Sequence, residues 1–334
     1  MKGKTMKPPS LPEGTAGPAS KKVDLVTGSN GRLGREMIHM LLKRGDTVRV
    51  LVKRKDFVVH LPTGVVPYVG DLGDTHILAD ACNGVDTVFH FAAIVSEHKE
   101  TVDTIMRVNV DGTRNVLDAC EQNHVNRMIF ASTVDVYGRK RRDLLTEESQ
   151  ARPTDKYGYS KMLAEQVIAR YHVTVPSTIL RFATIYGKGF EAAFFRMFQM
   201  IKEDRFAIIG NGKNKLNLLH VYDAMQALML ADMKDIAKNK IYNITDGNTY
   251  TQEQLIELAS KLLHAPTPTR HVYETLAMVL AKARKADADD LRFITSSRQI
   301  DISKAQQELG YEPRVSIEQG GEDLVAEFNK LGRR

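Results

Sequence analysis

Short runs of apolar and β-branched residues alternate with longer amphipathic segments through the first half of the chain. The apolar runs predict strands at 21–26, 47–52, 65–70, 86–93, 127–132 and 177–182. Apolar residues at helical spacing predict helices near 32–44, 75–83, 104–123 and 157–171. Strands that alternate with helices are typical of a parallel sheet covered by helices on both faces. We therefore predict an α/β fold with a doubly wound parallel sheet.

After about residue 187 the pattern becomes less regular. Helical segments are interspersed with short apolar runs at 206–210 and 241–245, and an amphipathic helix is predicted near 317–330. We interpret this part as a smaller C-terminal α/β lobe that covers a cleft. Residues 1–20 contain prolines among Gly, Ser and Lys and have little to bury, so we expect a flexible leader there.

Composition and charge narrow the classes of partner. The 334 residues carry 47 basic and 41 acidic side chains, a net charge of +6, which is weak evidence for a polyanionic partner. The basic run at 139–142 has no interleaved aromatic residues, so we interpret it as a solvated loop and expect no nucleic acid. No apolar run approaches the roughly 20 residues of a spanning helix, so we expect no membrane span.

Cysteines and histidines give no sign of a disulfide framework or a metal site. Cys82 and Cys120 lie far apart in the sequence, and neither stands in a metal-binding or redox-active spacing. We therefore expect a reducing, cytoplasmic setting. His60, His90 and His98 form no i, i+4 pair with a carboxylate on one helix, and scattered histidines are more often surface or core residues than ligands, so no metal site is predicted.

A glycine-rich loop connects the first predicted strand to the first predicted helix. In "VDLVTGSNGRLG", Gly28, Gly31 and Gly34 stand where a tight turn, close approach to a pyrophosphate and close helix packing each favour glycine. Three glycines alone also fit a flexible loop, but the position at the head of a βαβ series favours a dinucleotide site. We predict a Rossmann-type NAD(P)-binding domain over 21–187 and a mainly substrate-binding lobe over 188–334, packed on the first with some chain exchange.

The end of the second strand bears on the choice of cofactor. NAD-selective sites usually place a carboxylate there, roughly 20 residues after the glycines, to hold the ribose hydroxyls. This chain has Val52 at that place, followed by Lys53 and Arg54. Basic side chains attract a 2′-phosphate, so we predict that NADP(H) is favoured over NAD(H). The alternative is that these basic residues form a solvated loop.

Several motifs together point to one family. "TGSNGRLG", "GDLGD", "FHFAA", "VNVDGTRNVLDAC", "STVDVYG", "YGYSK" and "LRFATIYG" occur in that family's order and spacing. From about 22 to 328 the chain resembles the extended short-chain dehydrogenases/reductases of the NAD(P)-dependent epimerase/dehydratase superfamily. The resemblance implies an NAD(P)-dependent enzyme, and it is far less specific for the substrate.

The resemblance also assigns residues to the cofactor by their position. They belong to the glycine loop, to the adenine end, to the cofactor's path after the fourth strand, and to a structural asparagine in the long helix. In chain order, the implied contacts beside the three glycines are Asn30, Arg32, Leu33, Asp71, Leu72, Phe91, Ala92, Ala93 and Asn109. For each of them the alternative is ordinary packing at a strand end or within a helix.

Three residues match the family's proton-transfer site. Thr133 corresponds to the catalytic serine or threonine, with Ser132 as the weaker alternative. Tyr157 and Lys161 are four residues apart, so on a helix they share one face, whereas Tyr159 points elsewhere. The resemblance implies that Thr133 hydrogen-bonds the substrate oxygen, Tyr157 exchanges a proton with it, and the nicotinamide exchanges a hydride with the carbon.

Lys161 has two implied roles. It would hold the nicotinamide ribose, and its ammonium would favour the phenolate of Tyr157. A free tyrosine has a pKa of about 10 and is a poor base at neutral pH. We therefore expect Lys161, together with the positive charge of the oxidised nicotinamide, to lower the pKa of Tyr157.

Two positions distinguish the branches of the family that act on different substrates. Nucleotide-sugar enzymes usually carry an asparagine and an arginine where this chain has Thr184 and Leu216. The same segments look more like the branch resembling 3β-hydroxysteroid dehydrogenases and dihydroflavonol reductases. The apolar stretches at 190–198 and 273–283 would wall an apolar pocket or, equally well, belong to core or dimer packing.

We therefore expect an NAD(P)(H)-dependent oxidoreductase that exchanges a hydride with a secondary alcohol or ketone of a mostly apolar small molecule. One alternative is a nucleotide-sugar epimerase or dehydratase that recycles its cofactor internally. The other is a non-catalytic, cofactor-sensing protein. The family commonly pairs its two long central helices, here about 104–123 and 157–171, so we expect a homodimer.

Overall fold

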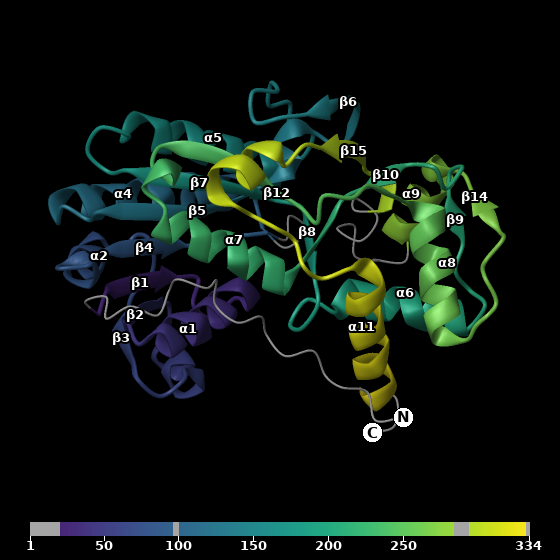
Figure 1. Cartoon of the computed structure of the whole chain (residues 1–334), viewed down its shortest axis with the longest axis horizontal. Coiled ribbons are helices and arrows are strands. Elements are labelled where there is room, and N and C mark those ends of the chain that lie inside the picture. Colours follow the sequence, from purple (N-terminus) through teal and green to yellow (C-terminus); the bar gives the residue numbers. More distant parts are fainter. Residues whose placement is uncertain (1–20, 96–99, 284–293, 332–334) are drawn as a thin grey trace.

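The computed structural model describes residues 21–95, 100–283 and 294–331; the leader predicted for 1–20 lies outside them. Its centre is a seven-stranded parallel sheet in the order β12-β7-β5-β4-β1-β2-β3 (Figure 1). The strands are β1 (Val23–Thr27), β2 (Thr47–Val52), β3 (Val65–Val69), β4 (Thr87–His90), β5 (Arg127–Thr133), β7 (Ser177–Phe182) and β12 (Lys240–Ile244). The order reverses between β1 and β4, where open α/β sheets bind their ligands. The predicted Rossmann-type sheet is confirmed.

Helices cover both faces of the sheet. One face carries α1 (Arg32–Arg44) and α7 (Val221–Met233), and the other carries α2 (Thr75–Cys82), α4 (Gly112–Gln122) and α5 (Lys156–Arg170). The long helix predicted near 104–123 is a composite of α3 (Val102–Met106), a π-helical segment (Arg107–Asp111) and α4. The π turn adds a residue to the helix next to the predicted cofactor path.

Successive side chains of the central strands enter two separate hydrophobic cores. Leu25 and Phe130 pack toward α2, α4 and α5, whereas Val26 and Ile129 pack toward α1 and α7. A strand alternates its side chains with a period of two, so a strand buried on both faces is a continuous apolar run. Burial of each such side chain stabilises the fold by about 2 kcal/mol. Because both faces of these strands are buried, every position favours an apolar residue, and the strands are recognisable as apolar runs in the sequence.

The chain returns to this sheet after leaving it. Beyond residue 188 it forms α7, which packs under β5 and β7, and then β12, which pairs in parallel with β7 along its whole length. The apolar run predicted at 241–245 is thus the seventh strand of the central sheet. The domain boundary at residue 187 stays a prediction.

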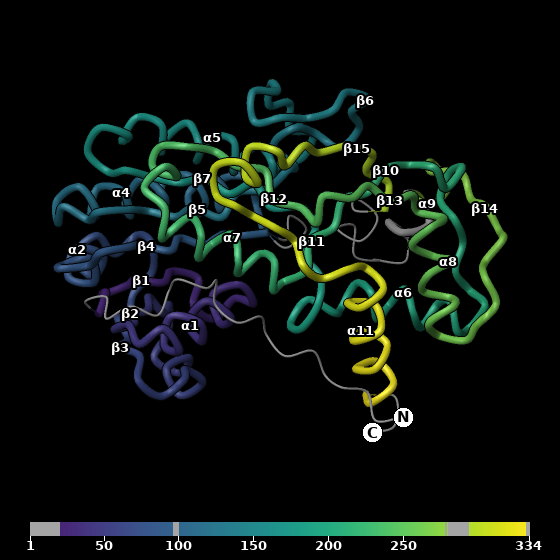
Figure 2. Tube along the Cα trace, in the orientation of Figure 1, coloured from purple at the N-terminus to yellow at the C-terminus, as the bar shows by residue number. Residues whose placement is uncertain are grey.

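The C-terminal lobe has a core of its own. It is built on α6 (Ala192–Lys202), α8 (Gln252–Leu263) and α11 (Ile317–Leu331), which lie together on one side of the sheet (Figures 1 and 2). Phe194 and Phe198 of α6 are buried between these helices. Short strands complete the lobe and its joins to the sheet: β6 (Lys140–Leu145), β8 (Thr184–Tyr186), β9 (Ile208–Ile209), β10 (Lys215–Leu216), β11 (Leu218–His220), β13 (Tyr250–Thr251), β14 (His271–Val272) and β15 (Ser297–Ile300). A further helix, α9 (Glu274–Ala283), follows β14.

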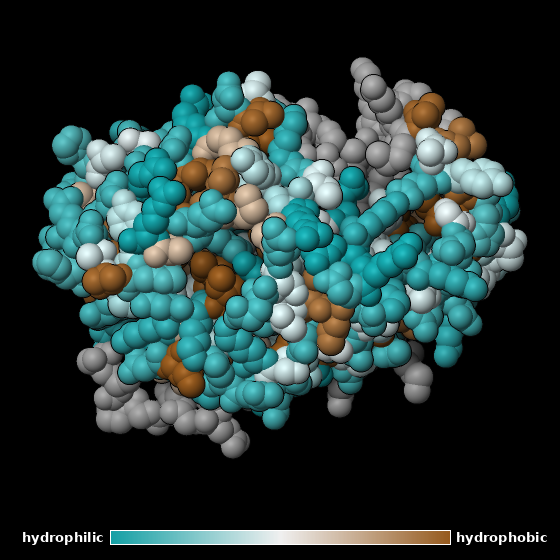
Figure 3. Space-filling view, turned by 90° about the horizontal axis from the view of Figure 1, so that it is seen from above, coloured by the Kyte–Doolittle hydropathy of each residue, from teal (hydrophilic) through white to brown (hydrophobic). Residues whose placement is uncertain are grey.

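One face of the molecule is mainly polar. The face shown in Figure 3 is largely hydrophilic, with apolar side chains in scattered groups. Among the helices of the described ranges, none is long and apolar enough to cross a membrane.

Buried charges join α1 and α7 at the amino ends of β1 and β4. Arg44 donates to Asp232 at 2.6 Å and to Asp24 at 3.1 Å, and Thr87 donates to Asp232 at 2.8 Å. The second carboxylate oxygen of Asp24 is buried with no hydrogen-bond partner in the described structure. Burial, followed by the charge of Asp232, raises the pKa of Asp24 from 3.8 to about 8.

The raised pKa of Asp24 makes stability depend on pH. In the unfolded chain this carboxyl ionises at its ordinary pKa, whereas in the folded chain it keeps its proton to about pH 8. Folding therefore binds a proton between these two values, and the free energy of unfolding falls as pH rises through that window. We expect Asp24→Asn, which cannot ionise, to gain melting temperature relative to the parent as pH is raised from about 5 to 8.

The exposed carboxylate Asp80 on α2 offers a matched control. Asp80→Asn makes the same chemical change at the surface. Its melting temperature should follow the parent at every pH. A constant difference between Asp24→Asn and the parent over this pH range would contradict the protonated state of Asp24.

Candidate active site

The loop between β1 and α1 requires glycine at two of the predicted positions. Gly28 has a φ of 70°, and a Cβ there would lie 2.6 Å from the amide nitrogen of Ala92. A Cβ on Gly34 would overlap the carbonyl oxygen of Gly28. Both obstacles are backbone atoms, which cannot rotate aside as a side chain can. The loop, the start of α1 and the end of β4 are thereby held in close contact.

The N-terminus of α1 has the chemistry of a pyrophosphate site. Its N-cap residue is Gly31, and no described side chain caps the helix. The first amides and the helix dipole are thus available to an anion. Arg32 is exposed with its guanidinium 5.6 Å from the Phe190 ring, and Leu33 packs against the core below. These residues fit a dinucleotide, with Asn30 beside them in the loop.

The end of β4 is braced by hydrogen bonds from both sides. His90 is buried and lies 2.6 Å from the hydroxyl of Thr27 and 3.0 Å from that of Thr113. Burial, then the charge of Lys161, lowers the pKa of His90 to about 3, so its imidazole is neutral. Phe91, Ala92 and Ala93 follow as half-buried residues along the predicted cofactor path.

Asn109 ties this path to α5. It sits in the π-helical segment, accepts from the amide of Ile94 at 2.7 Å and donates to the carbonyl of Ile94 at 3.0 Å. It also donates to the hydroxyl of Ser160 at 2.8 Å. These bonds account for a structural asparagine at this position. A direct contact of Asn109 with the cofactor stays a prediction.

Three of the residues predicted for the adenine end, Lys53, Arg54 and Asp71, lie at the surface after β2 and β3. Lys53 is exposed, and Arg54 donates to Asp56 at 3.0 Å while its guanidinium lies 5.3 Å from the Phe57 ring. Asp71 is also exposed and accepts from the amide of Gly73 at 2.7 Å. Its neighbour Leu72 is buried where Gly112 of α4 leaves room for it.

Ser132 and Thr133 point in different directions at the end of β5. The hydroxyl of Ser132 donates to Glu165 on α5 at 2.5 Å. Thr133 instead donates to Asp135 at 3.1 Å and accepts from the amide of Asp135 at 3.1 Å. The Ser132 hydroxyl is thus already hydrogen-bonded within the protein interior. Thr133 supplies the hydroxyl at the carboxyl end of β5.

The start of α5 packs directly on the turn that follows Thr133. Asp155 caps the helix by accepting from the amide of Gly158 at 2.7 Å. A Cβ on Gly158 would lie 2.7 Å from the carbonyl oxygen of Asp135. The glycine in "YGYSK" is therefore the point of contact between the two predicted catalytic motifs. Tyr157 stands one residue before it, in the first turn of the helix.

Burial sets the proton affinities of Tyr157 and Lys161. Burial, then the charges of Asp135 and Asp155, raises the pKa of Tyr157 above its ordinary value of 10.0. The expectation that Lys161 lowers the pKa of Tyr157 is therefore wrong for the protein alone. Lys161 is 2% exposed with its ammonium 3.9 Å from the centre of the Phe130 ring. Burial lowers the pKa of Lys161 to about 7, while Glu165 opposes that shift.

A buried ion pair lies directly behind these residues. Arg181 of β7 donates to Glu165 at 2.6 Å and to the hydroxyl of Tyr137 at 2.8 Å. Tyr137 donates in turn to Asn243 of β12 at 2.7 Å. Glu165 follows Lys161 by one helical turn, so this network fixes the lysine relative to the sheet.

Four residues of the site were missed by the sequence reasoning: Asp135, Glu165, Arg181 and Arg298. Arg298 of β15 is buried, donates to the carbonyl oxygens of Val134 and Gly138, and forms an ion pair with Asp135 at 2.8 Å. Glu165 carried a signal, since a carboxylate four residues after Lys161 lies on the same helix face. Arg298 carried none, because its partners are remote in sequence.

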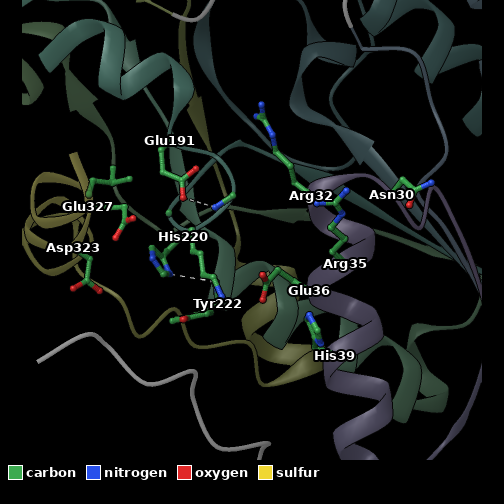
Figure 4. Close-up of a pocket in the computed structure, with 14 residues that line it drawn as sticks. Asn30, Arg32, Arg35, Glu36, His39, Glu191, His220, Tyr222, Asp323 and Glu327 are labelled. Carbon is green, nitrogen blue, oxygen red and sulfur yellow. Dashed lines mark hydrogen bonds between the residues drawn. The ribbon is translucent and has the colours of Figure 1, made fainter. Parts of the chain in front are cut away.

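A cavity of about 960 Å³ lies beside the glycine loop. Figure 4 shows Arg35, Glu36 and His39 of α1 facing Asp323 of α11 across it, with Tyr222 at the start of α7 between them. Thr133, Tyr157 and Lys161 do not line this cavity. It adjoins the pyrophosphate end of the predicted cofactor site and does not hold the predicted proton-transfer site.

The fold and this site define an extended short-chain dehydrogenase/reductase, a class of NAD(P)-dependent enzymes built on a Rossmann-type sheet. The sequence profile of the "NAD dependent epimerase/dehydratase family" matches residues 25–245, and the chain belongs to that family.

Relatives within the family act on different substrates. The chain is 29% identical over 313 residues to a 4-hydroxy-2-methyl-3-oxo-4-farnesyl-3,4-dihydroquinoline-1-oxide ketoreductase of Stigmatella aurantiaca, covering 88% of this chain and 93% of the relative. It is 26% identical over 326 residues to a 2-alkyl-3-oxoalkanoate reductase of Stenotrophomonas maltophilia, covering 90% and 98%. The solved structure "MoeE5 in complex with UDP-glucose and NAD" superposes with a TM-score of 0.76 at 26% identity, covering 94% and 100%.

The close contact at Gly158 should make turnover sensitive to a side chain at this position. In Gly158→Ala, the new methyl group meets the backbone of Asp135, so the start of α5 and Tyr157 must move away from Thr133. A displacement of about 1 Å at a reacting group costs roughly 100-fold in rate. We expect turnover in Gly158→Ala to fall by about that factor, measured as kcat/KM on any substrate that the parent converts.

Gly321→Ala on α11 is the matched control. Its Cβ would meet only the end of the Leu262 side chain, which can rotate aside. This variant should keep parental turnover. If both alanine variants were equally active, the close contact between α5 and the Thr133 turn would not govern the site.

Proposed function

We propose that the chain is an NADP(H)-dependent oxidoreductase that reduces a ketone on a mostly apolar small molecule and carries out the reverse oxidation. Thr133, Tyr157 and Lys161 form its proton-transfer site. The observation that carries the substrate class is the burial of Leu216.

Leu216 stands where the resemblance places an arginine in nucleotide-sugar enzymes. Its side chain is 1% exposed in β10, so the position belongs to the packed interior. Thr184, at the place of the expected asparagine, begins β8 and pairs with Leu218. A charge-assisted hydrogen bond to a phosphate contributes about 1.5–3 kcal/mol, and a leucine cannot supply it. The chain therefore lacks two groups that a sugar diphosphate would use.

The names of two relatives support a reductase. The Stigmatella aurantiaca relative is a ketoreductase and the Stenotrophomonas maltophilia relative is a 2-alkyl-3-oxoalkanoate reductase. Both align with about nine-tenths of this chain. Neither name is that of a nucleotide-sugar enzyme, in agreement with a substrate of apolar character.

The apolar stretches considered as pocket walls give no support. Phe194 and Phe198 pack in the core of the C-terminal lobe. On α9 and just before it, Tyr273, Leu276 and Val279 are between 50% and 83% exposed. Core packing accounts for the first stretch, and the second lies at the surface. The substrate class rests on Leu216 and Thr184 instead.

The residues of the site account for a carbonyl reduction. The phenol of Tyr157 is protonated at neutral pH, as a tyrosine ordinarily is, so it carries the proton that a reduced carbonyl oxygen takes up. Thr133 places its hydroxyl beside the alcohol that this reduction forms. With its pKa lowered to about 7, Lys161 is charged in part at neutral pH, and its protonated form favours the negative charge that develops on the carbonyl oxygen. A bound nicotinamide supplies the hydride.

A nucleotide-sugar epimerase or dehydratase is the second candidate. The solved structure with UDP-glucose and NAD has the same fold over nearly the whole chain. An enzyme of that kind recycles its cofactor and causes no net oxidation. A cofactor-sensing protein, the third candidate, would bind the cofactor and convert nothing.

Tyr157→Phe tests the enzyme assignment. Removing the hydroxyl removes the proton donor, and general acid catalysis contributes roughly 100-fold to 10,000-fold. We expect oxidation of NADPH with 4-phenyl-2-butanone, or with the best ketone of a panel, to fall by at least about 100-fold. UDP-glucose in the same panel should give neither NADPH oxidation nor an isomerised sugar.

Tyr159→Phe is the control, since Tyr159 lies on the same helix with 47% of its surface exposed. It should keep parental activity, and both variants should bind NADPH as the parent does. Full activity in Tyr157→Phe would refute the assignment. Isomerised UDP-glucose would support the epimerase, and binding without any conversion would support the sensor.

The preference for NADP(H) over NAD(H) belongs to the same proposal. Lys53 and Arg54 are exposed at the end of β2, where a carboxylate would select NAD. Arg54 is shared with Asp56, which orients its guanidinium beside the Phe57 ring. Against this preference, the solved neighbour holds NAD.

Arg54→Ala measures that preference. Loss of one charge-assisted contact to a 2′-phosphate should weaken NADPH binding by about tenfold, with NADH binding unchanged. Arg114→Ala is the control, because Arg114 is an exposed arginine paired with Asp111 on the composite helix, away from β2. Tighter binding of NADH than NADPH to the parent would show that the preference is wrong.

The homodimer and the cytoplasmic setting stay predictions. The helices expected to pair are joined within one chain, where the hydroxyl of Tyr171 donates to Asp118 at 2.5 Å. This contact holds α4 and the end of α5 together, as a shared dimer surface would require.

A further inference from the structure

Asp135 is a carboxylate at the reaction centre that the proposed chemistry leaves without a role. It lies two residues after Thr133, at the turn on which α5 packs. The side chain of Asp135 is 32% exposed, whereas that of its partner Arg298 is 8% exposed. A charged group so close to the proton donor influences any substrate oxygen that binds there.

Two hydrogen bonds to Asp135 fix the orientation of the Thr133 hydroxyl. The hydroxyl donates its one proton to a carboxylate oxygen of Asp135 at 3.1 Å and accepts the amide proton of Asp135 at 3.1 Å. A hydroxyl has one proton and two lone pairs. Only one lone pair is left, so toward a ligand Thr133 offers an acceptor and no donor.

Arg298 holds the carboxylate in this position. Its guanidinium lies 2.8 Å from the other oxygen of Asp135 and donates to the carbonyl oxygens of Val134 and Gly138 at 3.0 and 3.2 Å. The arginine is thus fixed at both ends of the turn. Since one carboxylate oxygen is held by Arg298, the other is left to face Thr133.

We propose that Asp135 is a positioning residue that turns Thr133 into a hydrogen-bond acceptor, so that the site binds the hydroxyl form of its substrate more tightly than the ketone form. An alcohol accepts from the Tyr157 hydroxyl and donates to Thr133. A ketone oxygen has no proton to donate, and only Tyr157 donates to it. The preference between the forms rests on the proposed function, whereas the bond between Asp135 and Thr133 does not.

Asp135→Asn reverses the polarity of this contact with almost no change in shape. The amide oxygen of the new side chain still accepts from Arg298. Its NH₂ group then faces Thr133 and donates to it, so the threonine proton becomes free to reach the substrate. Asp143→Asn is the matched control, because Asp143 pairs with Arg141 at 2.7 Å in an exposed strand and does not contact Thr133.

The first measurement needs no substrate. Melting temperatures of the full chain are compared for Thr133→Val, for Asp135→Ala, which removes the side-chain partner of Thr133, and for the double variant. Because the two side chains share a hydrogen bond, the double variant should lose less than the sum of the single losses, by about 1–2 °C. Strictly additive losses would overturn the proposal, since they would show that Asp135 and Thr133 do not interact.

The second measurement follows the polarity itself. Calorimetry gives the affinity of 4-phenyl-2-butanol for the NADPH complex and of 4-phenyl-2-butanone for the NADP⁺ complex. Asp135→Asn should shift the ratio of these affinities about tenfold toward the ketone, as expected for one hydrogen bond gained and one lost. In the Thr133→Val background the same substitution should leave the ratio unchanged, and Asp143→Asn should leave it at the parental value.

The outcomes distinguish a failure of the Asp135 and Thr133 contact from a failure of the proposed substrate class. An unchanged ratio in Asp135→Asn would overturn the proposal, because a merely structural role would alter melting temperature and leave the ratio alone. Coupled melting temperatures without binding of either probe would support the orientation of Thr133 and contradict the proposed substrate class.

Discussion

The ion pair between Arg181 and Glu165 holds together the elements on which the site is built. It joins β7 to α5, and the bond from Ser132 to Glu165 adds β5. Both charges are buried, and removal of one partner of such a pair costs about 3–5 kcal/mol because the other is left unpaired. The place of Lys161, one turn before Glu165, depends on this pair. The Tyr137 and Asn243 bonds extend the same constraint to β12.

Much of the fold could be predicted because its signals are local. A strand buried on both faces is a continuous apolar run, and Gly28 and Gly34 are required by contacts within the same βαβ unit. The contact between Asp135 and Arg298 could not be predicted, since nothing near either residue in the sequence points to the other. The membership of β12 in the central sheet was missed for a similar reason. An apolar run predicts a strand but does not say which sheet it joins.

The pKa of Tyr157 shows the limit of reasoning from spacing. A lysine four residues away on a helix is correctly placed on the same face, but the spacing carries no information about desolvation or about the carboxylates of Asp135 and Asp155. The apolar stretch around Phe194 and Phe198 was ambiguous in another way. An amphipathic helix has the same pattern whether its apolar side meets a core or a ligand, and only the packing partners distinguish these cases.

The buried charges around Arg44 and Asp232 lie at the opposite end of the sheet from the proton-transfer residues. The amino ends of β1 and β4 are joined there to α1 and α7, while Thr133 and the glycine loop lie at the carboxyl ends of their strands. The Arg44 and Asp232 anchor is therefore separated from the substrate site by the length of the strands. Loops at the carboxyl ends of the strands can therefore diverge between relatives without disturbing the hydrogen bonds of Arg44 and Asp232 at the amino ends. This arrangement fits a family that has acquired many substrates on one fold.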